Sequence, residues 1–157
     1  CAGAIVLAEA LEKNTTLTSL NLKFNKIGAE GAKELAEALA KNTKLTSLHL
    51  MHNEIGDNGA QALAKVLATN STLTSLDLFF NEIGADSAQA LAGALKKNNT
   101  LKSLNLKNSG VGEEGARALL KAIKQNKTLT DLSLSWDGIS DAVKCELEAA
   151  LKRNAMT

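Results

Sequence analysis

Serine, histidine and aspartate occur at spacings that could bring them together. His49 and Asp77 are 28 residues apart, and Ser47 and Ser75 each lie two residues before one of them. On adjacent strands these side chains would form the grouping that serine hydrolases use for nucleophilic attack. The serine, however, recurs at this spacing, at positions 19, 47, 75 and 103. A nucleophile is needed once, whereas a small hydroxyl in every strand is explained by packing, so we predict no catalytic residue and no enzyme.

His49 and His52 are close enough in sequence to share a metal ion. A zinc site takes three or four ligands from cysteine, histidine and carboxylate side chains. An aspartate is the only third ligand at hand, because Cys1 and Cys145 lie at opposite ends of the chain. The G-x-x-x-x-G-K-[ST] loop that cradles nucleotide phosphates is also absent from the sequence. We therefore predict no metal site and no cofactor.

The composition is that of a soluble, folded domain. Of the 157 residues, 45% are hydrophobic and 22% charged, and the formal net charge is +1. This balance excludes a basic nucleic-acid-binding protein and an acidic disordered tail, because both need a strong charge imbalance. The sequence has no apolar run long enough for a membrane span or a signal peptide. Two distant cysteines give no disulfide framework, so we expect an intracellular location.

A 28-residue repeat positions all of these side chains. The segment L-T-S-L-N-L at 17–22 returns, with small changes, at 45–50, 73–78, 101–106 and 129–134. The end of each segment alternates apolar and polar residues as a half-buried strand does, and the second half of each repeat has helical spacing. We predict one domain over 1–157, made of a half repeat at 1–14 and full repeats at 15–42, 43–70, 71–98, 99–126 and 127–154.

The repeats must stack on one another. A single strand–loop–helix coil has no second layer on which to bury its leucines, so a solenoid is expected. Strands lie about 4.8 Å apart and helices about 10 Å apart, so the stack must bend. We predict a right-handed α/β solenoid with a concave parallel sheet and convex helices. An asparagine follows every helix, at positions 14, 42, 70, 98, 126 and 154. We expect these residues to end the helices in the left-handed conformation.

The repeat pattern L-x-x-L-x-L-x-x-N-x-I-G-x-x-G-x-x-x-L-x-x-x-L resembles leucine-rich repeats of the ribonuclease-inhibitor type. Such repeats occur in ribonuclease inhibitor, the sensing ends of NOD-like receptors, Ran GTPase-activating proteins and bacterial effectors. The resemblance implies binding of another macromolecule along the concave sheet and its rims. It also implies that Asn25, Asn53 and Asn81 point inward and form a ladder between coils. Ser109 and Asp137 replace this asparagine in the last two repeats, so we expect a weaker ladder there.

The exposed positions that differ between repeats are the candidate binding site. All four aromatic residues, both histidines and one of the two methionines fall in these outward positions, whereas the repeated core positions contain none of them. Aromatic side chains and methionine are enriched in protein interfaces, and the accompanying charges are mixed, which suits a protein partner rather than nucleic acid. The predicted partner-binding residues are Phe24, His49, Met51, His52, Asp77, Phe79, Phe80, Lys107 and Trp136. An alternative is that Phe24, Phe80 and Trp136 fold back and only pack over the loops.

We predict a protein-binding module that acts in the cytoplasm, or in the host cytosol if it is a secreted bacterial effector. One alternative is a structural spacer in a larger receptor or effector, and another is a GTPase-activating protein. The two ends of the chain differ. Lys144, Glu148 and the residues at 152–154 form a polar C-terminal cap, whereas Ile5 and Val6 keep the N-terminal helix apolar. We expect that helix to meet further repeats, another domain or a second copy of the chain.

Overall fold

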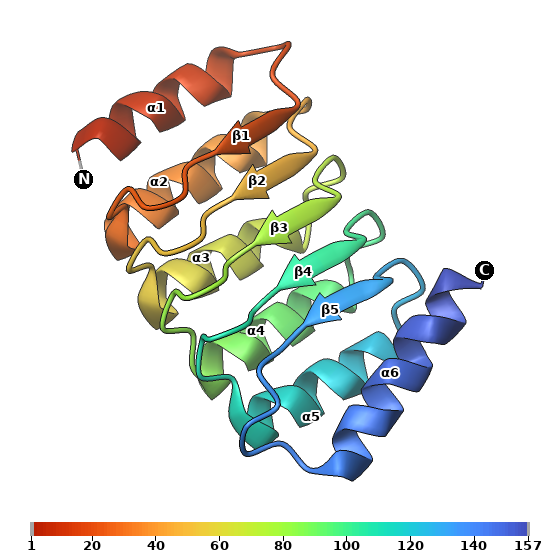
Figure 1. Cartoon of the computed structure of the whole chain (residues 1–157). Helices are drawn as coiled ribbons and strands as arrows, with labels where there is room; N and C mark the ends of the chain where they lie inside the picture. Colours follow the sequence, from red (N-terminus) through yellow and green to blue (C-terminus); the bar gives the residue numbers. More distant parts are fainter. Residues whose placement is uncertain (1, 157) are drawn as a thin grey trace.

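The computed structural model describes residues 2–156, which leaves Cys1 outside the described residues. Six helices and five strands alternate along residues 2–156 (Figure 1). The helices are α1 (Ala2–Lys13), α2 (Gly28–Lys41), α3 (Gly56–Leu67), α4 (Ala85–Leu95), α5 (Gly112–Ile123) and α6 (Asp141–Ala155). The strands are β1 (Ser19–Asn21), β2 (Ser47–His49), β3 (Ser75–Asp77), β4 (Ser103–Asn105) and β5 (Asp131–Ser133). The predicted α/β solenoid is confirmed.

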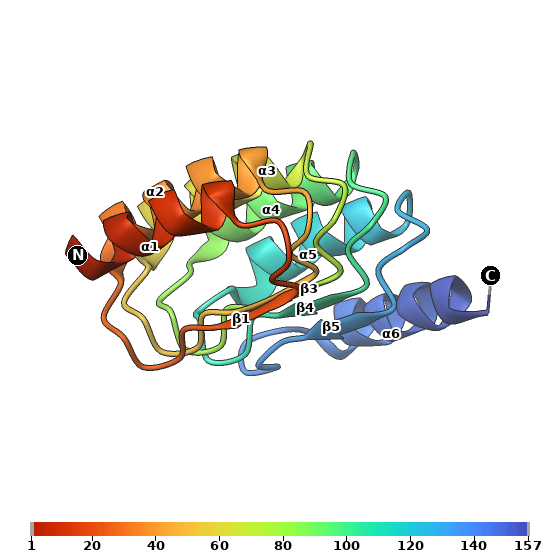
Figure 2. The ribbon, with the colours of Figure 1, turned by 90° about the horizontal axis from the view of Figure 1, so that it is seen from above.

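The five strands form one parallel sheet in the order of the sequence, β1-β2-β3-β4-β5. Each residue of β1 to β4 pairs with the residue 28 positions later in the next strand, so that Ser47 lies beside Ser75 and His49 beside Asp77. The alternating residues L-x-L at the end of each segment predict a strand that begins at a leucine, such as Leu20. Each strand begins one residue earlier, as β1 does at Ser19. The helices all lie on the same face of the sheet, with right-handed crossovers (Figures 1 and 2). One exposed face of the sheet therefore displays equivalent residues of successive repeats in parallel rows.

Small residues let the helices approach closely. Ala32, Ala60 and Ala88 are fully buried between neighbouring helices. A Cβ atom added to Gly59 would lie only 2.9 Å from the Cβ of Ala32 and 2.5 Å from the Cγ2 of Ile55. This close approach explains why glycine recurs one turn into most helices of the repeat.

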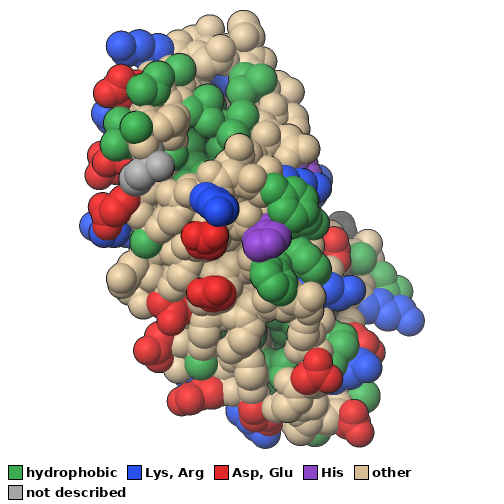
Figure 3. Space-filling view, turned by 60° about the vertical axis from the view of Figure 1, so that its left-hand side comes forward, with side chains coloured by type: hydrophobic (Ala, Val, Ile, Leu, Met, Phe, Trp, Pro, Cys, Tyr) green, Lys and Arg blue, Asp and Glu red, His purple; other side chains and the backbone are tan. Residues whose placement is uncertain are grey.

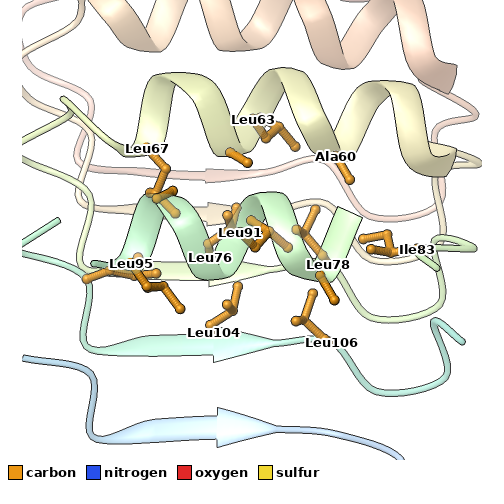
Figure 4. Packing of buried hydrophobic residues seen from close by; sticks show 14 of the residues in the cluster. Ala60, Leu63, Leu67, Leu76, Leu78, Ile83, Leu91, Leu95, Leu104 and Leu106 are labelled. Carbon is orange, nitrogen blue, oxygen red and sulfur yellow. The ribbon is translucent and has the colours of Figure 1, made fainter. Parts of the chain in front are cut away.

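Leucines and isoleucines fill the space between the sheet and the helices. Leu76 and Leu78 of the third repeat meet Leu91 and Leu95 of α4, with Ile83 closing the loop side (Figure 4). These side chains are at most 2% exposed, and burying each one contributes roughly 1.5 to 3 kcal/mol before conformational entropy is subtracted. The core is continuous from α1 to α6 and contains no phenylalanine.

The asparagine ladder forms where a preceding coil is present. Asn53 and Asn81 are fully buried, and their amides donate to Leu22 O and Leu50 O of the preceding coil. The prediction for Asn25 was wrong. Its side chain is exposed and donates only to Lys23 O in its own loop, because the half repeat supplies no coil for it to reach. In the fourth repeat Ser109 has a hydroxyl in place of the amide. Its oxygen accepts Asn81 N at 3.5 Å, whereas the Asn81 oxygen accepts Asn53 N at 2.9 Å.

The asparagines that follow the helices were predicted wrongly to be left-handed. Asn42 has an extended backbone, with φ −72° and ψ 129°, and no residue of its column within 2–156 has a positive φ. Instead, the Asn42 amide donates to Leu11 O and Asn14 O of the preceding coil, and its oxygen accepts Leu45 N. The bond to the preceding coil recurs at the later members of the column, Asn70, Asn98 and Asn126. A second ladder therefore holds the opposite loops together.

The two ends of the solenoid are finished differently. At the C-terminus, the Arg153 guanidinium donates to Ile123 O and Asn126 O at the end of α5. At the N-terminus, Val6 of α1 is 65% exposed and Ile5 is 38% exposed. None of the helices within residues 2–156 combines the length and apolar composition that spanning a membrane requires.

Candidate protein-binding surface

Three rings form a row where strands β1, β2 and β3 lead into their loops. The rings of Phe24 and His52 meet edge to face with centroids 5.2 Å apart, and those of His52 and Phe80 meet in the same way at 4.8 Å. We call these three residues the aromatic ladder. Phe24 is 66% exposed and Phe80 is 46% exposed. Figure 3 shows a histidine between hydrophobic side chains on this surface. The ladder is an apolar surface that stays open to a partner.

The backbone beneath the ladder is left-handed. Phe24, His52 and Phe80 have φ values of 60°, 53° and 54°, and Asn108 has φ 53° at the same position of the fourth repeat. This conformation costs roughly 1 to 2 kcal/mol for most residues, and asparagine and glycine are the residues that tolerate it. The loop would therefore fold more easily with asparagine, as it does at Asn108. Backbone geometry therefore does not account for the aromatic rings.

Phe79 and Met51 widen the apolar surface beside the ladder. The ring of Phe79 stacks on that of Phe80, with a centroid distance of 6.3 Å and an interplanar angle of 29°. Phe79 and Met51 are half-buried, unlike the more exposed ladder residues. Five of the predicted binding residues therefore lie together, since the ladder and these two side chains occupy adjacent coils.

A polar cluster lies on the sheet next to this surface and consists of Ser47, His49 and Asp77. The Nε2 atom of His49 lies 3.1 Å from the hydroxyl oxygen of Ser47, within hydrogen-bond distance. The Nδ1 atom of His49 is buried, has no hydrogen-bond partner within residues 2–156, and lies 3.8 Å from Asp77 Oδ2. A distance of 3.8 Å is too long for a hydrogen bond, so the carboxylate does not orient the imidazole as catalysis would need.

Lys23 places a positive charge next to the carboxylate of Asp77 in the polar cluster. Its Nζ lies 4.0 Å from Asp77 Oδ2, which places one positive and one negative side chain on the sheet beside the histidine. Within residues 2–156, no group of three histidine, cysteine or carboxylate side chains is arranged to hold a metal ion. The cluster is suited to exchanging hydrogen bonds and charge contacts with a protein surface.

Trp136 and Lys107 stand apart from the five clustered residues. Trp136 is partly buried against the core, and Lys144 of α6 lies over its ring at 5.4 Å from the centroid. For this residue the local-packing alternative describes what is observed. Lys107 is exposed, and the residue after it is Asn108 rather than an aromatic residue, so the ladder ends at Phe80. The column of Trp136 by itself could not separate it from the ladder, because the covering side chain, Lys144, stands in a helix column that carries alanine in the earlier repeats.

The chain is similar to leucine-rich domains of known families and structures. The family model described as the TMOD/LMOD leucine-rich domain matches residues 29–155, and a leucine-rich-repeat model matches residues 13–36. Among solved structures, leiomodin-1 actin-binding site 2 is 27% identical with a TM-score of 0.88, covering 98% of this chain and 88% of that chain. The tropomodulin C-terminal domain of Caenorhabditis elegans is 21% identical with a TM-score of 0.84, over 99% and 93% of the two chains, a likeness of fold alone. The comparison with curated proteins finds no match.

Proposed function

Because the chain belongs to the TMOD/LMOD leucine-rich domain family, we propose that it is an actin-binding domain whose contact surface is the aromatic ladder with Phe79, Met51 and the polar cluster. The relative with the higher identity, leiomodin-1, is described as an actin-binding site, and its structure aligns with nearly all of this chain. That similarity supports actin as the partner. The observation that carries the choice of surface is the ladder itself.

Energetics favour a binding role for the ladder. Three aromatic side chains occupy left-handed positions that asparagine would fill with less strain, and Phe24 and Phe80 among them are exposed. Aromatic side chains at the centre of an interface typically contribute on the order of 2 kcal/mol or more each. Binding energy of that size offsets the backbone strain and explains why the rings are present.

The neighbouring charges suit a protein surface. Lys23 and Asp77 lie beside the ladder within 4.0 Å of each other, so the rim carries both signs. A phosphate backbone would need a surface of one positive sign. Mixed charges around an apolar centre are the arrangement found in protein interfaces. We assign Lys107 to the outer rim of the same site and leave Trp136 to the packing of α6.

The remaining features extend this proposal. The 28-residue period, with a helix in every repeat, supports the ribonuclease-inhibitor type of leucine-rich repeat. Residues 1–157 then form a single non-enzymatic leucine-rich-repeat domain that acts inside the cell, where actin is found. The exposed Ile5 and Val6 are suited to contact with a further repeat or domain at the N-terminal end.

The test is cosedimentation with filamentous actin, together with fluorescence anisotropy on labelled monomeric actin. The informative variant is the double substitution Phe24→Asn and Phe80→Asn, because Asn108 shows that the loop accepts asparagine at this position. We expect the double variant to bind at least about tenfold more weakly, as expected for the loss of two interface aromatics. Its melting temperature should stay close to that of the wild type.

The matched control is Lys121→Ala, an exposed substitution on α5 in the helix layer, which should leave actin binding unchanged. Unchanged binding by the double variant would remove the ladder from the site. A wild-type chain that binds neither form of actin would overturn the proposal as a whole and favour the spacer alternative. Stimulated hydrolysis in a panel of small GTPases would instead favour the GTPase-activating alternative.

A further inference from the structure

The outer face of the helix layer carries a groove that the proposed function does not use. It has a volume of about 1020 Å³ and runs across α2, α3 and α4, which lie side by side (Figure 1). Alanines from all three helices, a valine and one glycine make up its apolar lining, among them Ala40, Ala62, Val66, Ala90 and Gly93. The strands form the other layer (Figure 2), and the residues of the aromatic ladder follow closely after strands β1, β2 and β3. A ligand in this groove would therefore not compete with one on the sheet.

Comparison of equivalent positions shows that long side chains are missing over the groove. The position of Glu34 in α2 is taken by Ala62, Ala90 and Ala118 in the three central helices and by Glu146 in α6. The position of Glu37 in α2 is taken by Lys65, Gly93 and Lys121 in the next three. The apolar floor is therefore confined to the middle of the solenoid, and longer polar side chains surround it.

Gly93 is the least expected of these residues. It lies inside α4, where glycine weakens a helix relative to alanine. A Cβ atom added there would meet no atom within 4 Å, in contrast to Gly59, where neighbouring atoms leave no room. Packing within the chain therefore does not require glycine at position 93. Its effect is to leave the backbone of α4 open to close approach from outside.

The charges around the groove are mostly positive. Four lysines and one glutamate line it, and Lys33 is already paired with Glu30. The other three, Lys65, Lys96 and Lys97, form no ion pair with another residue of the described chain. An apolar floor with unpaired lysines along its edge complements a ligand that is apolar on one side and acidic at its margins.

We propose that this groove is a second docking site, which takes an amphipathic helix carrying acidic side chains. Small residues on one helix allow a second helix to pack across it at an axial distance of about 8 Å. Neighbouring helices lie about 10 Å apart, so the groove spans about 20 Å, which about 13 helical residues match. Apolar side chains of the bound helix rest on Ala62, Ala90 and Gly93, and its acidic side chains meet Lys65 and Lys97.

The proposal is tested by NMR titration of the ¹⁵N-labelled chain with a designed 14-residue peptide helix. The peptide carries leucines along one side and glutamates beside them, and a matched peptide has lysines in place of the glutamates. The acidic peptide should shift the amide signals of Ala62, Ala90 and Gly93 and leave those of the aromatic ladder unchanged. The lysine peptide should bind at least tenfold more weakly.

Two pairs of variants locate the binding. Gly93→Gln fills the groove without changing charge and should abolish the shifts, whereas Gly93→Ala should retain them and raise the melting temperature. Lys65→Glu with Lys97→Glu should weaken binding at least tenfold, whereas Lys121→Glu, which lies outside the groove lining, should not. Melting curves of all variants exclude unfolding as the cause of any loss.

Several results would overturn the proposal. The proposal fails if the chain binds the two peptides with equal affinity, if the amide signals that shift belong only to the sheet layer, or if Gly93→Gln binds the acidic peptide as well as the wild type does. Self-association of the chain that Gly93→Gln abolishes would make a second copy the occupant instead. Binding to phosphatidylserine vesicles that Gly93→Gln abolishes, without binding of the acidic peptide, would assign the groove to a lipid surface. Actin binding is read out separately, so failure here leaves the proposed function untouched.

Discussion

The hydroxyl of Ser87 in α4 donates a hydrogen bond of 2.5 Å to the carboxylate of Asp57 in α3, which belongs to the preceding coil. The same carboxylate accepts the backbone N–H of Gly84 at 2.9 Å, where α4 begins. Ser87 replaces the glycine that stands at this position in the neighbouring repeats, and it is fully buried. A carboxylate in the first turn of one helix thus holds the residue that precedes the next helix.

Replacing Asp57 with alanine should destabilise the domain by roughly 1 to 2 kcal/mol, because Gly84 N loses its acceptor and the buried hydroxyl of Ser87 keeps only a backbone acceptor. Urea denaturation measures the change. The double variant with Ser87→Gly should recover part of the loss, since the hydroxyl that needs an acceptor is then gone. Strictly additive effects of the two substitutions would contradict the coupling.

Asn53 and Asn25 occupy the same position in successive repeats but should differ in their contribution to stability. Asn53→Ala removes the bond to Leu22 O and takes the side-chain acceptor away from Ile27 N, whereas Leu50 O keeps the amide of Asn81. At about 1 to 3 kcal/mol for each buried group left without a partner, the loss should reach several kcal/mol.

Asn25→Ala is the matched control, because that side chain is exposed and bonds only within its own loop. It should change the free energy of unfolding by at most about 0.5 kcal/mol, as is usual for surface substitutions. Equal effects of the two substitutions would show that the position acts through loop conformation rather than through the ladder.

The aromatic ladder should contribute little to stability. Phe80→Asn replaces a phenylalanine in the left-handed conformation with a residue that tolerates it, which should raise the free energy of unfolding by up to about 1 kcal/mol. The substitution also removes the ring contacts with His52 and Phe79, which should lower the free energy of unfolding by a similar amount. The free energy of unfolding should therefore stay within about 1 kcal/mol of the wild type, as measured by urea denaturation. A loss of more than about 3 kcal/mol, the size expected for a core phenylalanine, would identify Phe80 as a core residue.

Glu113 should make the start of α6 sensitive to acid. The hydrogen bond from the Ser140 backbone N–H is the main cause that lowers the pKa of the Glu113 carboxyl; desolvation opposes it, and the Ser140 hydroxyl and Arg117 lower the pKa further. Because the pKa is lower in the folded chain, the stabilisation is complete above the carboxyl's ordinary pKa. It is lost as the pH falls through the folded-state pKa.

The measurement is the melting temperature between pH 7 and pH 3 for the wild type and for Glu113→Gln. The wild type should lose more stability on acidification than the variant. Glu146→Gln provides a comparison at a second site, because a hydrogen bond from Lys124 lowers the pKa of that carboxyl too. Parallel curves for wild type and Glu113→Gln would show that the contact with Ser140 is not linked to folding.

The 28-residue period by itself determined the architecture. It places Leu48 and Leu76 in the same register on neighbouring strands, and a coil of this length has no other way to bury its apolar side chains. It also predicts that the aromatic residues lie on outward rows, because a column that varies between repeats is not needed for packing, and Phe24 and Phe80 are indeed exposed.

Features that depend on the neighbouring coil were decided only by the tertiary structure. Asn42 is extended because its amide reaches carbonyls in the preceding coil, a partner that local rules for helix ends do not include. Asn25 is exposed because the half repeat before it has a helix but no strand or loop for its amide to reach, and Trp136 is half-buried with Lys144 of α6 over its ring.

The row of edge-to-face rings and the groove around Gly93 likewise depend on how coils are set against one another. A repeat pattern fixes which residues are equivalent. It does not fix what each of them meets, because that depends on the presence and orientation of the neighbouring coil.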